Sequence, residues 1–359
     1  MSLGALDQVH RAKLARNSLW VCFLLLGTVS MGWVPRIPEI KDAIGLSNGA
    51  FGFVLLGSTF GSITGAQLAG RFMHMYGSQR TIFVGVFIMP AGLAGMGLAT
   101  NALTLFLTLY TMGFGYALID MCYNFQGTVV EKILGRRYMS SFHAMWSTGA
   151  FLTTVVGGLI SRHVSPRANL LAIAAVSIVA YLIAAYYLLP RTIDGHKGDE
   201  EHESKIPLFG KGVMPLWLLG VGLLSSLVGE GAASDWGAIL LRDEMGYEKG
   251  VYASAFASFA LAMIVSRFLG DRALDYFGPA RLVQLGGYLG GSIWGIAMLI
   301  AIPMSDTYPI PALLIVNIGF IAAGLGIGPM FPAFILAATK IPGIAPAVAI
   351  SRVGVIGIA

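Results

Sequence analysis

The chain alternates long apolar runs with short polar segments. Eleven runs, most of them about 20 residues long, are almost free of charge. A helix of about 20 apolar residues crosses a bilayer, whereas a membrane barrel strand alternates over about 10 residues. The pattern therefore predicts an all-α integral membrane protein. Its spans lie near 17–36, 49–72, 80–99, 102–131, 139–161, 167–189, 213–237, 250–269, 280–302, 309–338 and 342–359.

The composition supports a membrane location. Of 359 residues, 56% are hydrophobic and only 11% are charged, against about 25% charged in a soluble domain. The formal net charge is +5, but the basic residues lie mostly in short loops between the spans. We therefore expect a lipid bilayer around the chain and no nucleic-acid partner.

The distribution of basic residues predicts the orientation. With the N-terminus in the cytoplasm, sixteen Lys and Arg residues fall on the inner side and six on the outer side. Positively charged loops stay in the cytoplasm during insertion. This bias predicts a multi-pass protein whose N-terminus is cytoplasmic.

One long hydrophilic stretch, 191–212, follows the sixth span. It predicts a flexible cytoplasmic linker between an N-terminal six-helix bundle, 1–190, and a C-terminal bundle, 213–359. His196 and His202 lie in it among acidic residues. We favour a solvated charged linker over a metal site there, and therefore predict no bound metal.

The two halves repeat. Residues 41–49, KDAIGLSNG, align with residues 242–250, RDEMGYEKG, at an offset of 201, and the same offset pairs Gly77 with Gly278. One offset that holds at two separate places indicates two six-helix bundles of parallel topology. It also predicts that the eleventh span continues, and that a twelfth follows, beyond Ala359.

The fourth span carries a polar stripe. Asp120, Asn124, Thr128 and Glu131 follow one another at steps of four or three residues, which places them on one face of a helix. A charged group at bilayer depth costs a few kcal/mol or more, and such groups usually face a bundle interior or a water-filled path. We interpret Asp120 as a proton-coupling residue and Asn124 as part of a substrate cavity. The alternative is a structural polar contact between packed helices.

The fifth span opens with the segment MSSFHAMWSTG. His143 and Ser147 share a helix face in it, and Trp146 is adjacent. We predict that His143 and Trp146 line the substrate cavity. The alternative for His143 is a structural hydrogen bond to a neighbouring helix.

The seventh span holds two further acids. Glu230 lies between two glycines, and Asp235 and Trp236 follow it. We interpret Glu230 as a second proton-coupling residue and place Asp235 in the cavity, with a solvated position at the outer interface as the alternative. Trp236, and Trp33 of the first span, offer either a stacking surface for a sugar ring or an interfacial aromatic belt.

The tenth span contains GLGIGPMFP, residues 324–332. Glycine and proline in the middle of a span favour a bent helix, because a cavity or neighbouring helices can satisfy the freed backbone groups. A simple packing kink is the alternative.

Six plus six spans, a central linker and basic loops after spans two and eight resemble the major facilitator superfamily. The loop signature of that family is Gly-x-x-x-Asp-Arg-x-Gly-Arg-Arg. The matching positions are Gly70, Gly77 and Arg80 in the first half and Asp275, Gly278 and Arg281 in the second. His74 replaces the Asp of the signature in the first half, and Asp271 replaces its first Gly in the second.

The resemblance implies a monomeric secondary transporter that works by alternating access and is coupled to protons. In this fold the first, fourth, seventh and tenth spans line a central cavity, so Asp120 and Glu230 would face each other across it. The segments WVPRIPEIKDAIGLS, GYALIDMCYN, MSSFHAMWSTG and GEGAASDW further resemble the bacterial fucose-permease-type sugar–proton symporters. Those permeases carry an acid in their first helix, whereas nothing acidic precedes Glu39 in the first span here.

The resemblance thus implies a sugar or a related small polar metabolite as substrate and the bacterial inner membrane as location. Drug–proton antiport is an alternative, because Met- and Phe-rich walls suit bulky apolar compounds. A receptor that binds without transport is an alternative of another class. The sequence has no Walker loop, zinc-ligand spacing or nucleophile elbow, so we expect neither an enzyme nor a cofactor.

Overall fold

The computed structural model describes residues 3–194 and 213–338, and the single positions 340, 341, 344, 349 and 353. The described residues form helices and turns and contain no strand. Their contacts divide the chain into two compact units, Met1–Asp199 and Glu200–Ala359, and each unit is considered by itself below. Most of the predicted linker, 195–212, and most of the predicted eleventh span lie outside the described residues.

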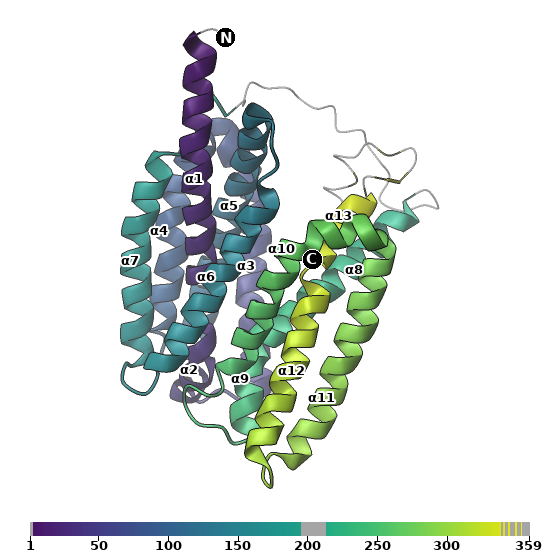
Figure 1. The fold of residues 1–359 in the computed structure, drawn as a ribbon. Coiled ribbons are helices and arrows are strands. Elements are labelled where there is room, and N and C mark those ends of the chain that lie inside the picture. The colour runs from purple at the N-terminus through teal and green to yellow at the C-terminus, as the bar shows by residue number, and fades with distance from the viewer. Residues whose placement is uncertain are drawn as a thin grey trace. The chain divides into compact units, whose positions relative to one another are not determined.

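The first unit is a helical bundle in which long helices run side by side (Figure 1). Six long helices match the first six predicted spans, and a short helical segment follows the first of them. The elements are α1 (Leu3–Met31), η1 (Val34–Arg36), α2 (Ile37–Ile44), α3 (Asn48–Tyr76), α4 (Ser78–Met96), α5 (Ala102–Leu134), α6 (Met139–Ile160) and α7 (Pro166–Tyr186).

Polar residues in the loops cap the N-termini of the helices that follow them. The hydroxyl of Ser47 accepts a hydrogen bond from the backbone amide of Ala50 and caps α3. Asn101 and Thr104 form a reciprocal capping box at the start of α5. Each cap satisfies backbone amides that have no partner within the helix.

Small residues let α3 and α5 pack backbone against backbone. Gly57, Gly61 and Gly65 recur every four residues and form one stripe along α3. A Cβ atom added at Gly61 would lie 2.1 Å from the carbonyl oxygen of Tyr110 in α5. Because lipid tails are as apolar as leucine, membrane helices associate largely through such close packing.

The second unit is also helical (Figure 1), and π-helical turns interrupt its longer helices. Its elements are α8 (Met214–Gly231), η2 (Ala232–Trp236), α9 (Gly237–Ile239), η3 (Leu240–Glu244), α10 (Ser254–Leu285), η4 (Gly286–Gly290), α11 (Gly291–Met304), α12 (Pro309–Ile327) and α13 (Met330–Ala338). The segments η2, η3 and η4 are π-helical.

The predicted bend in the tenth span is confirmed. Helix α12 ends at Ile327 and α13 begins at Met330, so the helix breaks at Gly328 and Pro329. Proline lacks the amide that would continue the ladder of hydrogen bonds.

Eight stretches of the described residues are long and apolar enough to cross a membrane, and Ser254–Gly270 is a shorter apolar helix. Helix α6 is not among the eight, although it coincides with the predicted fifth span. Its Ser, Thr and His residues lower its hydropathy. Helix α6 still exposes the apolar side chains of Leu152, Val156 and Leu159.

The backbone supports the internal repeat. Gly45 ends α2 with φ 75°, and its counterpart Gly246 has φ 71°. Gly77 has φ 84° and ψ 159°, while Gly278, which kinks α10, has φ 72° and ψ 161°. Positive φ is strained for residues with a side chain, so the glycines of these two aligned pairs have the same conformational role in both halves. The third pair differs, because Gly49 lies within α3 whereas Gly250 has φ 88°.

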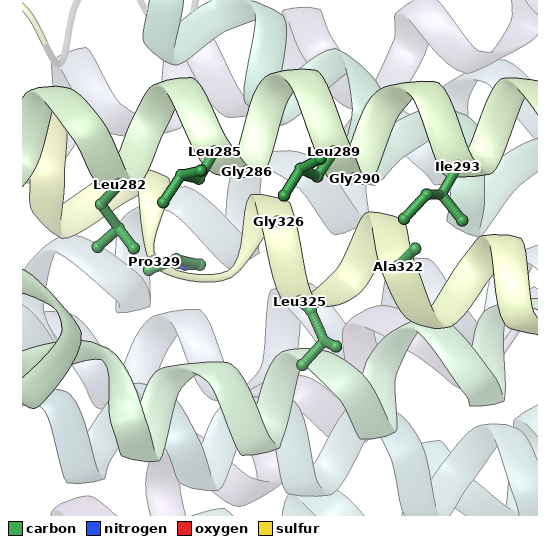
Figure 2. Close-up of a pocket in the computed structure, with 10 residues that line it drawn as sticks. All are labelled: Leu282, Leu285, Gly286, Leu289, Gly290, Ile293, Ala322, Leu325, Gly326 and Pro329. Atoms are coloured by element: carbon green, nitrogen blue, oxygen red, sulfur yellow. The ribbon is translucent and has the colours of Figure 1, made fainter. Parts of the chain in front are cut away.

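An apolar groove of about 240 Å³ lies in the second unit, between the α10–η4–α11 segment and α12 (Figure 2). Leu285 and Leu289 line it from one side, and Leu325 and Pro329 from the other. None of its lining residues is ionisable. The groove therefore offers no group that would orient a polar solute.

Candidate functional site

The centre of the candidate site is a contact between α5 and α6. The Oδ1 atom of Asn124 lies 3.2 Å from Nε2 of His143. The Nδ2 atom of Asn124 donates a hydrogen bond of 2.9 Å to the backbone carbonyl of Asp120, one turn earlier. Because an amide oxygen only accepts, this arrangement favours the His143 tautomer with the proton on Nε2.

Helix α1 also contacts the candidate site, through an aromatic side chain. The ring of Phe23, on α1, lies 5.2 Å from the ring of His143 in an edge-on arrangement. The side chains of Asp120, Asn124 and His143 are each partly buried. Helices α5 and α6 thus bring an amide and an imidazole together one turn from Asp120, and α1 adds the ring of Phe23.

Thr128 and Glu131, the last two residues of the predicted polar stripe, have structural roles. Oε1 of Glu131 accepts hydrogen bonds from the backbone amides of Tyr138 and Met139, the latter at 2.7 Å. These amides lie at the start of α6, so Glu131 caps that helix. Thr128 donates a hydrogen bond to the carbonyl of Asn124 in its own helix. Only Asp120 and Asn124 of the four stripe residues remain candidates for chemistry.

Trp146 lies in the packed interface of α1 and α6. Its side chain is buried, and a Cβ atom added at Gly27 of α1 would lie 1.9 Å from the carbonyl oxygen of Trp146. Ser147 is also buried and donates a hydrogen bond to the carbonyl of His143. Trp146 thus packs α6, the helix that carries His143, against α1, and Ser147 is hydrogen-bonded within α6.

Trp33 is also buried, with only 4% of its surface exposed. Its ring lies 6.3 Å from the ring of Phe51 in α3. A belt tryptophan presents its ring to the membrane interface, whereas Trp33 is part of the packed core of the first unit.

A buried arginine near Trp33 was not among the predicted site residues. Arg36 is fully buried, its Nε lies 3.0 Å from a carboxylate oxygen of Glu39, and its Nη2 donates to the carbonyl of Val164 at 2.6 Å. The spacing of Arg36 and Glu39, three residues apart on a helical segment, is the sequence signal for this ion pair. The hydrogen bond from Arg36 to Val164 joins η1 to the connection between α6 and α7.

In the second unit Glu230 has a partner that the sequence analysis missed. Oε2 of Glu230, on α8, lies 3.9 Å from Nη2 of Arg267, on α10. The two side chains are 16% and 17% exposed. Glu230 lies inside the predicted seventh span, 213–237, and Arg267 inside the predicted eighth span, 250–269.

Asp235 and Trp236 belong to the π-helical segment η2. An oxygen of the Asp235 carboxylate accepts a hydrogen bond of 3.1 Å from the hydroxyl of Ser234, and both Asp235 and Trp236 are partly buried. Single π-helical turns often occur at functional sites. The segment that follows Glu230 therefore has an irregular backbone next to the acid.

The signature loop of the first unit, between α3 and α4, is hydrogen-bonded by an arginine that is not part of the signature. Arg191, which follows α7, donates hydrogen bonds of 3.0 Å to the carbonyl of Met75 and 3.2 Å to that of His74. A Cβ atom added at Gly77 would lie 2.9 Å from Cβ of Arg191. A cation thus covers the carboxyl end of α3, where helix carbonyls lack internal partners. Arg80 is exposed one turn into α4.

The signature loop of the second unit, around Gly278, has fewer close contacts than that of the first unit. No atom outside the local backbone lies within 4 Å of a Cβ built at Gly278, and Asp275 and Arg281 are exposed. Gly70, the first glycine of the signature in the first half, also has open space around it. The structure does not bring these residues together with the candidate site of their own unit.

Among the described residues no group of three or more His, Cys, Asp or Glu side chains is arranged to hold a metal ion. The polar groups of the candidate sites described above are carboxylic acids, an amide, an imidazole and a guanidinium. These groups suit proton transfer and the binding of polar solutes.

The comparison that decides the family covers nearly the whole chain. The model of the Major Facilitator Superfamily matches residues 19–357. The chain belongs to the Major Facilitator Superfamily. The chain is similar to the uncharacterized transporter y4wD of Sinorhizobium fredii, 29% identical over 86% of this chain and 78% of that protein. An uncharacterized MFS-type transporter of Yersinia pestis is 28% identical over 94% of this chain and 84% of its own length.

Solved transporters share the superfamily fold. A mutant of the nucleoside transporter NupG has a TM-score of 0.76 and 12% identity, covering 96% of this chain and 87% of its own. A D-xylose–proton symporter has a TM-score of 0.71 and 16% identity, covering 96% of this chain and 88% of its own. At this identity the similarity shows a shared fold.

Proposed function

We propose that the protein is a proton-coupled secondary transporter of a small polar solute, working by alternating access. The observation that carries this proposal is the contact of 3.2 Å between Asn124 and His143, one helical turn from Asp120. An acid inside an apolar span is costly, and such residues usually serve a transport path or a proton relay.

In this proposal Asp120 takes up and releases the coupling proton. Desolvation favours the neutral form of a carboxylic acid, so the unloaded site can close without trapping a bare charge. Asn124 and His143 supply one donor or acceptor each and hold the solute by hydrogen bonds. Their mutual contact keeps both polar groups satisfied while the solute is absent.

In our proposal Glu230 provides a second acid, in the second unit, and Asp235 and Trp236, in the segment that follows it, also contact the solute. A nucleoside transporter and a xylose–proton symporter share the fold, which supports a small polar solute rather than a bulky apolar drug. The resemblance to fucose-permease-type symporters points to the same substrate class.

We further propose that the protein lies in the bacterial inner membrane as a monomer with a cytoplasmic N-terminus, and that 191–212 links its two bundles. The relatives named above are bacterial. The excess of Lys and Arg on one side of the membrane supports this orientation.

Transport by purified protein in proteoliposomes tests the function. We expect preloaded unlabelled solute to drive counterflow of a labelled solute, and an inward proton gradient to drive its accumulation. Repeating the assay with neutral sugars, nucleosides, sugar acids and cationic drugs identifies the class of solute that is transported. Saturable binding of a solute without any counterflow would instead identify a receptor.

A further inference from the structure

The guanidinium of Arg16, on α1, is held between two aromatic rings at one end of the first unit. Its central carbon, Cζ, lies 5.0 Å from the centroid of the Trp20 ring and 5.4 Å from that of the Tyr138 ring. Trp20 donates a hydrogen bond of 2.9 Å to the hydroxyl of Ser141 in α6, and the two rings meet edge-on at 6.2 Å. Helix α1 and the start of α6 thus fix the position of the guanidinium.

Arg16 retains two hydrogen-bond donors for a further ligand. An arginine side chain has five N–H groups. Nε and Nη2 donate to Oδ1 of Asn17 at 3.2 Å and 2.9 Å, and Nη1 donates to the hydroxyl of Tyr138 at 3.4 Å. One N–H group on each of Nη1 and Nη2 has no acceptor among the described residues. Because Arg16 is only partly buried, an outside group with two acceptor oxygens can reach these donors.

Four further cations come from the same end of the unit. Lys13 lies one turn before Arg16 on the same face of α1. Lys132, Arg136 and Arg137 lie at the end of α5 and in the turn that leads to α6. All four are exposed, and none of these five cations forms an ion pair with a described carboxylate. We call the five residues the Arg16 patch.

The acids that α1 and α5 contribute to this region have partners outside the Arg16 patch. Glu131 accepts hydrogen bonds from the backbone amides of Tyr138 and Met139. Asp7, more than two turns before Arg16, is paired with Arg11 at 3.6 Å. The positive charge of the patch is therefore not balanced by the described residues around it, which favours an anionic ligand.

The Arg16 patch lies at the border of the apolar runs. The predicted first span begins at residue 17, the fourth ends at 131 and the fifth begins at 139. The five cations thus lie just outside the predicted hydrocarbon layer, at the level of lipid headgroups, where Trp and Tyr are also enriched. Leu14 and Val21 on α1 are 38% and 43% exposed, so apolar surface for an acyl chain lies next to the cations.

We propose that the Arg16 patch binds the phosphate of an anionic phospholipid. Arg16 donates hydrogen bonds to the phosphate oxygens, and the other four cations attract the negative charge of the headgroup. The position favours a lipid over a soluble anion, because the phosphate of a lipid already lies at this level. A zwitterionic lipid offers the same phosphate but adds a cation that the patch repels. The bound lipid joins α1 to the α5–α6 turn, and its binding depends on neither the solute nor proton coupling.

Native mass spectrometry of the purified full-length chain in detergent tests the proposal. The probes are phosphatidylglycerol, which carries a net negative charge, and phosphatidylcholine, which carries none, with identical acyl chains. We expect phosphatidylglycerol to bind about tenfold more tightly, and an equal concentration of glycerol 3-phosphate not to displace it. Equal binding of the two lipids would overturn the proposal. Displacement by glycerol 3-phosphate would overturn the lipid as occupant and assign the patch to a soluble phosphate compound.

Variants assign the lipid to the patch. Arg16→Gln should weaken the binding of phosphatidylglycerol about tenfold or more and leave that of phosphatidylcholine unchanged. Arg16→Lys retains the charge but not the planar guanidinium, so its affinity should lie between those of Arg16→Gln and the wild type. Arg80→Gln removes an exposed arginine from another loop of the same unit and should bind both lipids as the wild type does.

A second variant keeps the test decisive if Arg16→Gln fails to fold. Arg136→Gln/Arg137→Gln changes two exposed side chains, so its thermal unfolding without lipid should match the wild type. Its affinity for phosphatidylglycerol should fall at least about fivefold. Unchanged affinity in this double variant would contradict the site. An equal loss in Arg80→Gln would also contradict it, because the attraction would then depend on the total charge rather than on the patch.

Discussion

The carboxylate of Asp194 accepts two hydrogen bonds from Ser78, one from the backbone amide at 3.1 Å and one from the hydroxyl at 2.9 Å. Ser78 is the first residue of α4, so Asp194 caps that helix from a segment that follows α7. Gln126 of α5 donates to the Ser78 hydroxyl and to the carbonyl of Leu189, each at 2.8 Å. A buried polar network thus ties three helices of the first unit together.

Asp194→Ala should destabilise the first unit by about 2 kcal/mol, because it removes a helix cap and leaves the buried Ser78 amide without its acceptor. The thermal unfolding of the detergent-solubilised protein measures this as a lower transition temperature. Asp306→Ala, at an exposed position, is the matched control. An unchanged transition in Asp194→Ala would show that the network contributes nothing to stability.

Gly61→Leu should prevent the first unit from folding. Even a Cβ atom at Gly61 would lie 2.1 Å from the carbonyl oxygen of Tyr110, so α3 and α5 would have to separate. Gly61→Ala should fold but lose about 1–3 kcal/mol. Gly70→Ala, on the same helix with open space around it, should match the wild type. Yield and monodispersity in size-exclusion chromatography, followed by thermal unfolding, distinguish these cases.

The helices could be predicted closely because a bilayer leaves so few alternatives. The apolar run 102–131 became α5, Ala102–Leu134, and the run 167–189 became α7, Pro166–Tyr186. In hydrocarbon each backbone group must be bonded within its helix, so apolar length alone specifies the element. The π-helical turns in η2 and η4 were not predicted, since they depend on local packing rather than on hydropathy.

The candidate site could be predicted only in part, because helical periodicity shows which residues share a face but not what faces them. The steps from Asp120 to Glu131 were read correctly as one stripe. Yet Glu131 caps the next helix across a loop, whereas Asn124 meets His143. Likewise, no local spacing connects Glu230 with Arg267, because the two residues come from separate helices.

Cysteine labelling tests the predicted orientation. Asn48 precedes the second span and Thr192 follows the sixth, and both are exposed. We expect Asn48→Cys to react with an impermeant maleimide added outside intact cells, and Thr192→Cys to react only after the membrane is opened. The native Cys22 and Cys122 are free and buried, and their replacement by alanine gives the background. The reverse labelling pattern would overturn the cytoplasmic N-terminus.

His143→Leu should raise the KM for the transported solute about tenfold or more, because the solute loses a hydrogen-bond partner and Asn124 loses its contact. His143→Gln retains a hydrogen-bond donor and an acceptor, so its KM should lie between those of His143→Leu and the wild type. His163→Leu replaces an exposed histidine in the turn after α6 and should have no effect. If His143→Leu transports normally while its stability falls, the histidine is a structural partner of Asn124.

Asp120→Asn tests coupling most directly. Asp120 lies inside α5, which has no Lys or Arg before Lys132, so no cation precedes that residue on its own helix. Asparagine has nearly the shape of the protonated acid but cannot release a proton. On our proposal the variant site can always close, so counterflow across the membrane should persist, whereas accumulation driven by a proton gradient should disappear. Asp306→Asn, at an exposed position, should retain both activities.

The same assay separates the other roles of Asp120. Loss of both counterflow and accumulation, in a protein that still folds, would indicate that Asp120 binds the solute or holds the helices together rather than carrying the proton. Unchanged accumulation would exclude Asp120 from coupling and leave Glu230 as the other proposed proton-coupling residue, which Glu230→Gln then tests in the same vesicles. Since Glu230 lies 3.9 Å from Arg267, its neutralisation also removes a negative charge from beside a guanidinium. The double variant Glu230→Gln/Arg267→Gln, in which the pair is neutral, therefore separates a coupling defect from a charge defect.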